Sequence, residues 1–104
     1  MCGRFVFHSS PKIIEENFDI QCSSKLKPHY NIAPSQYVAA IKENYKKNRE
    51  LIFLRWGLIP SWANNSAIGN HMFNARVETI SEKPSFRQAF KKRRCVILAD
   101  GFYE

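Results

Sequence analysis

The chain has 104 residues, of which 44% are hydrophobic and 24% are charged, a balance that excludes disordered, collagen-like and low-complexity proteins. Its 16 basic and 9 acidic residues give a formal net charge of +7, which favours an anionic partner such as nucleic acid. Three cysteines without a C-x-x-C pair argue against a disulfide framework or a zinc site. No apolar run reaches the ~18 residues of a membrane span. We therefore expect one cytoplasmic domain over residues 1–104, with no metal, cofactor or membrane contact.

The N-terminal segment is predicted to form a strand followed by a helix. Residues 2–8 alternate in side-chain character, which is typical of a short strand. Ser10 and Pro11 then supply a capping hydroxyl and a proline for the first helical position, so we expect a helix through Asn17. The apolar face of this helix is expected to carry Ile13, Ile14 and Phe18.

Two strand-like runs in the middle of the chain predict a β-hairpin. Residues 19–28 are polar and indicate a loop, whereas residues 36–41 and 51–56 are rich in strand formers. Residues 44–49 have the composition of a turn, so the two strands should pair. Residues 60–70 are expected to form an irregular loop.

The remaining residues should form extended segments and one further helix. Residues 73–80 indicate extended backbone, and residues 84–92 are compatible with a helix that turns Phe86 and Phe90 inward. The continuous apolar run 95–99 predicts a strand that is buried on both faces. Several short strands with two short helices predict an α+β fold.

Positive charge is concentrated in and around the second predicted helix. Residues 83–94 include six basic side chains and no acidic one. Such a surface suits the phosphate backbone of nucleic acid, and a basic surface that only aids solubility is the alternative. Arg87 lies inside this run and is a candidate for a DNA contact.

Cys2 is the residue with the clearest capacity for covalent chemistry. Because cysteine is small, methionine aminopeptidase should remove Met1, which leaves an α-amine and a thiol on adjacent carbons. The amine can condense with an aldehyde to a Schiff base, and the thiol can then close a thiazolidine ring. An incidental cysteine at a disordered start is the alternative, although the strand-like run that follows should tie the N-terminus to the fold.

Asn74 and Arg76 form a second candidate group. Two positions apart on a strand, their side chains would point to the same face. An amide beside a guanidinium suits a phosphate or sugar oxygen. A surface ion pair between Arg76 and Glu78 is the alternative.

Two tryptophans flank a predicted turn. Trp56 and Trp62 could belong to the core, or they could stack on unpaired bases, an interaction worth about 1–3 kcal/mol for each base. Pro60 before Trp62 favours a loop position and therefore a binding role for that ring.

Glu104 follows an apolar strand, where a buried carboxylate without a partner would be costly, so we expect it to face a site or solvent.

Five short motifs occur along the chain in a characteristic order. They are MCGRF at 1–5, YNIAP at 30–34, RWGLIPSW at 55–62, NARVET at 74–79 and ADGFYE at 99–104. Together they resemble the SRAP family, the SOS-response-associated peptidases or abasic-site processing proteins, and the resemblance covers nearly the whole chain.

The resemblance implies a DNA damage response protein that binds single-stranded DNA carrying an abasic site. The family's nucleophile maps onto Cys2, which would capture the ring-opened deoxyribose aldehyde as a thiazolidine crosslink. The site asparagine and arginine map onto Asn74 and Arg76, and the glutamate that would relay protons maps onto Glu104. The DNA-binding candidates are Arg4, Asn31 and Trp62, which match positions that line the family's DNA groove, together with Trp56 and Arg87.

The resemblance also implies what is missing. The family domain is about twice as long, and we expect a mostly antiparallel, barrel-like sheet of which this chain is the N-terminal part, truncated at its C-terminal side. The second half of the family carries a histidine that assists sugar opening and crosslink reversal, and this sequence has no corresponding segment. The expected partner is abasic single-stranded DNA. A second copy or the missing C-terminal half is expected as well, because an uncovered apolar edge strand after residues 95–104 would invite pairing. Association with the nucleoid during repair is expected as well.

Two other functions stay open. In an N-terminal-nucleophile peptidase or autoprocessing hydrolase, Cys2 would attack an amide and its own amine would serve as the base. In a non-catalytic binding module, a basic and aromatic surface would hold single strands through phosphates and stacking. Such a module would show steep salt dependence and indifference to abasic sites.

Overall fold

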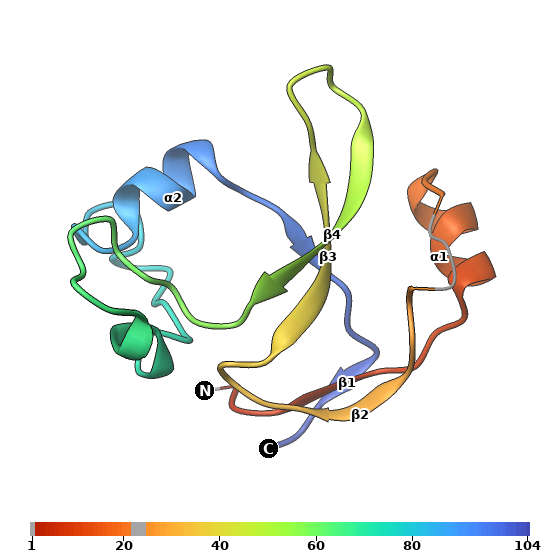
Figure 1. Cartoon of the computed structure of the whole chain (residues 1–104), viewed down its shortest axis with the longest axis horizontal. Helices are drawn as coiled ribbons and strands as arrows, with labels where there is room; N and C mark the ends of the chain where they lie inside the picture. The colour runs from red at the N-terminus through yellow and green to blue at the C-terminus, as the bar shows by residue number, and fades with distance from the viewer. Residues whose placement is uncertain (1, 22–24) are drawn as a thin grey trace.

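The computed structural model describes residues 2–21 and 25–104 of the chain. Over these residues, short strands form two three-stranded antiparallel sheets, accompanied by two α-helices and one 3-10 helix (Figure 1). The α+β class is therefore confirmed. The expected barrel is wrong, because no strand of one sheet is hydrogen-bonded to a strand of the other within the described residues.

The first sheet is built around the N-terminal strand. Its strands, in order across the sheet, are β2 (His29–Ile32), β1 (Phe5–Phe7) and β6 (Gly101–Phe102). Phe5 lies opposite Ile32 of β2 and opposite Phe102 of β6. The strand predicted over 2–8 is thus confirmed in its middle, and Phe5 and Phe7 are buried on one of its faces.

Helix α1 spans Pro11–Phe18 and follows β1 after a short connection (Figure 1). As predicted, the Ser10 hydroxyl oxygen caps it by accepting a hydrogen bond from the backbone N–H of Ile13. Ile14 is buried and Phe18 is half-buried. Ile13 is 48% exposed, so its expected place on the apolar face is wrong. Neighbouring residues lie about 100° apart around a helix, and here Ile14 alone of the pair points to the core.

The predicted hairpin is confirmed as β3 (Tyr37–Glu43) and β4 (Arg49–Arg55), which pair in register along their full length. The side-chain oxygen of Asn44 accepts hydrogen bonds from the backbone N–H groups of Lys46 and Asn48, and this fixes the turn. The tip of the hairpin projects away from the rest of the molecule (Figure 1).

The second sheet has the order β4-β3-β5, with β5 (Val96–Ile97) at its edge. The prediction of a strand over 95–99 buried on both faces is wrong. Val96 and Ile97 are 51% and 44% exposed, and in that run Leu98 alone is buried. Within the described chain β5 pairs only with β3, so its outer edge stays uncovered.

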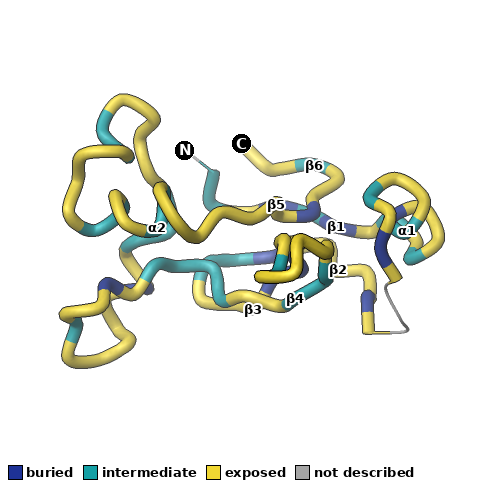
Figure 2. Tube along the Cα trace, turned by 90° about the horizontal axis from the view of Figure 1, so that it is seen from above, coloured by how far each residue is buried: buried dark blue, intermediate teal, exposed yellow. Residues whose placement is uncertain are grey.

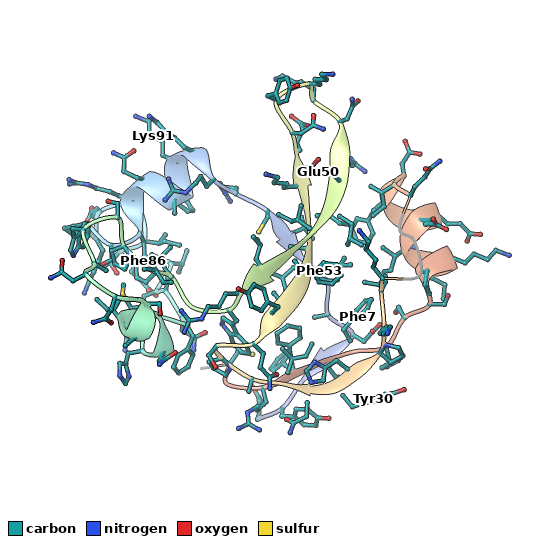
Figure 3. The ribbon with its side chains drawn as sticks, in the orientation of Figure 1. Phe7, Tyr30, Glu50, Phe53, Phe86 and Lys91 are labelled. Carbon is teal, nitrogen blue, oxygen red and sulfur yellow. The ribbon has the colours of Figure 1, made fainter. Side chains whose placement is uncertain are left out.

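Short helices and turns make up the lobe that precedes β5. The 3-10 helix η1 (Ser66–Asn70) lies inside the loop predicted over 60–70, and helix α2 (Arg87–Lys92) begins later than predicted. Figure 3 shows Lys91 on the outer side of α2, whereas Phe86 lies toward the neighbouring loops. Phe86 is half-buried, in line with its expected inward orientation.

The extended segment predicted over 73–80 is wrong in its second half. The backbone N–H groups of Thr79 and Ile80 donate hydrogen bonds back to the carbonyl oxygen of Arg76, at 3.2 and 2.9 Å. These bonds turn the chain, so residues 77–80 form turns and residues 73–76 have no strand partner within the described residues.

The hydrophobic core lies between the two sheets and beneath α1. Figure 2 shows buried residues in the middle of the molecule and beside α1, whereas most of the α2 lobe is exposed. The buried cluster consists of Phe5, Phe7, Ile14, Ile20, Leu26, Ile32, Val38, Ala39, Ile41 and Leu98. None of the helices formed by the described residues has the length and apolar character needed to cross a membrane.

Candidate functional site

Cys2 is half-buried just before β1, and a residue far away in the sequence holds its backbone. The side-chain Nδ2 of Asn74 donates a hydrogen bond of 2.8 Å to the carbonyl oxygen of Cys2. The thiol of Cys2 points toward the carbonyl oxygen of Arg4, with an Sγ–O distance of 3.8 Å. Two of the predicted site residues, Cys2 and Asn74, are therefore in direct contact, whereas Met1 lies outside the described residues.

Trp56 supports the contact between Asn74 and Cys2 through the residue that precedes Asn74. Its Nε1 donates a hydrogen bond of 2.8 Å to the carbonyl oxygen of Phe73, the residue before Asn74. The indole ring is half-buried and makes edge contacts with Phe5 and Phe73, at centroid distances of 5.3 and 6.1 Å. These contacts engage both the N–H group and much of the ring within the chain. The base-stacking role of Trp56 stays a prediction.

A groove of about 670 Å³ opens beside Cys2. Its walls come from both sheets and from α2, and most of the lining side chains are apolar. They include Cys2, Phe5, Trp56, Ala89, Ile97 and Phe102. The groove therefore leads directly to Cys2, the candidate nucleophile.

Arg4 and Asn31 lie together on the solvent-exposed surface of the first sheet. The Nη1 of Arg4 donates a hydrogen bond of 3.1 Å to the side-chain oxygen of Asn31. Tyr103 joins them, because its backbone N–H donates to the carbonyl oxygen of Arg4 and its hydroxyl donates to that of Tyr30, at 3.0 and 2.7 Å. Figure 3 shows Tyr30 on the outside of this sheet. Two predicted DNA contacts thus share one polar and aromatic surface.

Glu104 is exposed, and the pairing of β6 with β1 brings it close to Cys2 along the ladder. These strands run antiparallel with Phe5 opposite Phe102. Continued by two residues, this register places Glu104 opposite Gly3. The backbone of Glu104 therefore lies beside the residues that lead into β1.

Three predicted site residues stand apart from this contact network. The side chains of Arg76, Trp62 and Arg87 are exposed and form no hydrogen bond or ion pair within the described part of the chain. The alternative ion pair between Arg76 and Glu78 is likewise absent there. The strand on which Asn74 and Arg76 were expected to share a face is not formed, since the chain turns after residue 76.

The basic run 83–94 surrounds α2, and all six of its basic side chains are exposed. The guanidinium carbon of Arg94 lies 4.5 Å from the centre of the Phe90 ring, a cation–π contact. Arg93 also lines the groove beside Cys2. The positive surface of the lobe is therefore continuous with the groove.

Asp100 is a structural anchor that the sequence pattern did not single out. Its carboxylate accepts hydrogen bonds from the Ser9 hydroxyl and from the backbone N–H groups of His8 and Ser9, at 2.6 and 2.9 Å for the N–H groups. The Ser9 hydroxyl and then the His8 N–H lower the pKa of Asp100, because they stabilise its charged form. Its own N–H donates to the carbonyl oxygen of Val6 at 2.8 Å. The one sequence signal was an acidic residue directly after an apolar run.

The described residues contain no group of three or more His, Cys, Asp or Glu side chains arranged to hold a metal ion. Cys2 and Cys95 carry free thiols. Cys22 and the middle of the polar loop predicted over 19–28 lie outside the described residues.

Comparison with known proteins gives the family. A family model described as SOS response associated peptidase (SRAP) matches residues 1–104. The chain is 50% identical over 107 residues to the abasic site processing proteins YoaM of Bacillus subtilis and YoqW of Bacillus phage SPbeta, and each match covers 100% of this chain and 47% of the relative. It is 40% identical over 93 residues to HMCES of Xenopus tropicalis, a match that covers 79% of this chain and 28% of that protein. The chain thus spans about half the length of its bacterial and phage relatives, and it belongs to the SRAP family of abasic site processing proteins.

Proposed function

We propose that this protein acts in the DNA damage response by binding single-stranded DNA and capturing abasic sites through Cys2 after Met1 has been removed. The observation that carries the proposal is the hydrogen bond from Asn74 to the carbonyl oxygen of Cys2. This bond uses only the carbonyl oxygen of Cys2, a residue that lines the groove, and does not involve its thiol. The α-amine would become available once Met1 is removed. Membership of a family whose relatives are named abasic site processing proteins supports the same reaction.

The reaction joins the aminothiol of Cys2 to the aldehyde of the ring-opened deoxyribose. The α-amine adds to the aldehyde carbon, a proton moves from nitrogen to oxygen, and water leaves to give a Schiff base. The sulfur then adds to the carbon of the C=N bond, and the thiol proton moves to the nitrogen as the five-membered thiazolidine closes. One water molecule is released for each crosslink, and no oxidant or reductant is needed.

Two further side chains are proposed to assist. Glu104, beside the start of β1, would accept and return protons while the Schiff base forms. Arg76 has an exposed guanidinium with no partner among the described residues, so it is free to bind a phosphate next to the lesion.

DNA would approach across the exposed basic and aromatic surface. Arg4 and Asn31 would contact the strand on the first sheet, and the exposed ring of Trp62 would stack on a base. Arg87 and the other basic residues of 83–94 would bind phosphates through charge. Trp56 is not assigned to this surface, because its N–H group and its ring contact other residues of the chain.

The test is incubation of the purified protein with a single-stranded oligonucleotide that carries one abasic site, followed by a denaturing gel. We expect a covalent band with the wild-type protein and none with Cys2→Ala. Cys95→Ala is the matched control, because it removes an exposed thiol that has no adjacent α-amine. Intact mass should show loss of Met1 before the reaction and addition of the oligonucleotide minus one water after it.

Other outcomes point to the other functions. Equal crosslinking by Cys2→Ala and wild type would refute the proposal. Salt-dependent binding with no covalent band, equal for intact and abasic strands, would indicate a non-catalytic binding module. A covalent acyl adduct with a peptide and none with abasic DNA would indicate a peptidase.

A further inference from the structure

We propose that Trp56 is a positioning residue for the capture reaction, because its indole holds the Asn74 segment against the strand that follows Cys2. This inference rests on the proposed function, since it concerns how fast Cys2 is presented to the abasic site. It assigns Trp56 a role that acts through Asn74 and differs from base stacking.

The first support is the hydrogen bond from Trp56 to the backbone next to Asn74. The carbonyl oxygen of Phe73 belongs to the peptide group that continues into Asn74, and it accepts the indole N–H at 2.8 Å. Residues 73–76 form no helix or strand, so few other bonds fix this stretch. The nearest backbone anchor before it is the bond from Leu58 to Met72, also 2.8 Å long. The indole N–H therefore fixes the orientation of the peptide group that joins Phe73 to Asn74.

The second support is the position of the ring. The indole packs edge-on against Phe5 of β1 at an interplanar angle of 62° and against Phe73 at 90°. Phe5 lies three residues after Cys2, and Phe73 is the residue before Asn74. One side chain therefore sets the spacing between the two segments that the Asn74–Cys2 hydrogen bond joins.

The third support is the contrast with Trp62. The Trp62 ring is 59% exposed and makes no ring contact or hydrogen bond within the described residues. It has the geometry expected of a stacking platform, whereas Trp56 is half-buried and has its polar group engaged. The two tryptophans of one motif thus have different surroundings, and the chain itself provides a matched pair for the experiment.

The test is a double-mutant cycle between Trp56→Phe and Asn74→Ala. Trp56→Phe keeps an aromatic ring and removes the N–H donor. Two quantities are measured, namely the single-turnover capture rate at saturating abasic oligonucleotide and the affinity for the same strand without an abasic site. Trp56→Phe should slow capture roughly fivefold to tenfold and leave the affinity unchanged. In the Asn74→Ala background it should have little additional effect, because the side chain through which it acts is already gone.

Trp62→Phe, alone and combined with Asn74→Ala, is the matched control. The factors by which Trp62→Phe and Asn74→Ala each change the capture rate should multiply in the double variant. The proposal is overturned if Trp56→Phe slows capture by the same factor in both backgrounds. It is also overturned if Trp56→Phe weakens strand affinity and leaves the saturated rate intact, a result that would assign Trp56 to stacking. If Trp56→Phe does not fold, replacement of its indole by benzothiophene in a Trp62→Phe background keeps the ring shape and removes only the N–H.

A readout without DNA separates this inference from the proposed function. Proton exchange of the Asn74 side-chain amide, followed by NMR, should be slowed in the wild-type protein and should accelerate in Trp56→Phe toward that of the exposed Asn64. Unchanged exchange contradicts the positioning role whether or not the protein forms crosslinks. Accelerated exchange in a protein that does not crosslink would leave the positioning role standing and refute the capture reaction alone.

Discussion

The side-chain amide of Asn74 donates a 2.8 Å hydrogen bond to the carbonyl oxygen of Cys2, although 72 positions separate them in the chain. The bond uses the backbone of Cys2 and neither of its nucleophilic groups. An amide is well suited to this task because its N–H donors carry no net charge that would compete for the thiol or the amine. Asn74 can therefore hold Cys2 in place without taking part in the chemistry.

Exchange of this donor for an acceptor should impair capture. In Asn74→Asp an oxygen replaces the donating nitrogen, so the carboxylate and the Cys2 carbonyl would repel each other. We expect the capture rate to fall by more than the roughly tenfold that loss of one hydrogen bond explains. Asn64→Asp makes the same charge change at an exposed position and should react like the wild type. Equal rates for the two variants, measured by quenched denaturing gels, would contradict the role of Asn74.

Asp100 should make the stability of the fold sensitive to acid. Because the Ser9 hydroxyl and the His8 N–H lower the pKa of folded Asp100, its carboxylate stabilises the fold above the ordinary aspartate pKa of about 3.9. This contribution should disappear as the pH falls through the lowered pKa of the folded protein. Asp100→Asn should therefore be less stable than the wild type at pH 7, and the difference should shrink below about pH 4.

Urea unfolding followed by circular dichroism between pH 2 and pH 7 would measure the effect of Asp100. Asp19→Asn is the control, because it removes the same charge from the exposed C-cap of α1, where asparagine also tolerates the left-handed backbone. A difference between Asp100→Asn and wild type that is constant over the whole pH range would rule out the carboxylate as its cause.

Trp62 should contribute to strand binding and little to folding. Its ring is 59% exposed, so Trp62→Ala should leave the unfolding midpoint nearly unchanged and weaken single-strand binding by about 1–3 kcal/mol. Fluorescence anisotropy at a fixed salt concentration would measure the affinity. Tyr45→Ala is the matched control, because that ring is 90% exposed at the tip of the hairpin, away from Cys2. A similar loss for both variants would show that Trp62 has no specific contact with the strand.

Gly57 should not tolerate a side chain. Its φ of +138° is disfavoured for other residues, and a Cβ there would lie 2.2 Å from the carbonyl oxygen of Gly69. Gly57→Ala should therefore lower the free energy of unfolding by about 2–5 kcal/mol. Gly3→Ala is the control, because a Cβ at Gly3 would meet nothing within 4 Å. Equal unfolding midpoints for the two variants would show that the close approach between the two glycines can relax freely.

The elements that the sequence predicted well are those with local causes. Ser10 caps α1 within one turn, and Asn44 closes the hairpin turn through its own side chain. The errors arose where distant packing decides. The exposed edge of β5 and the absence of a closed barrel depend on what covers the sheets, and an apolar run alone does not carry that information.

The candidate site shows the same division. The motif order placed Cys2 and Asn74 in one site, and the structure brings them into contact. The residue pattern around Asn74, however, predicted a strand where the chain turns. Asp100 was not found because its partners, His8 and Ser9, lie more than 90 positions away. Contacts of such separation leave no periodic signal in a single sequence.

The central place of β1 in its sheet has a consequence for the order in which the protein acquires its structure. The ribosome releases β1 first, but one of its two neighbours, β6, comes about a hundred residues later. Pairing across such separations is slow, whereas the β3–β4 hairpin can close locally in about 1–10 μs. We therefore expect the hairpin to form early during synthesis. Cys2 would stay outside its final surroundings until residues 100–103 have been made.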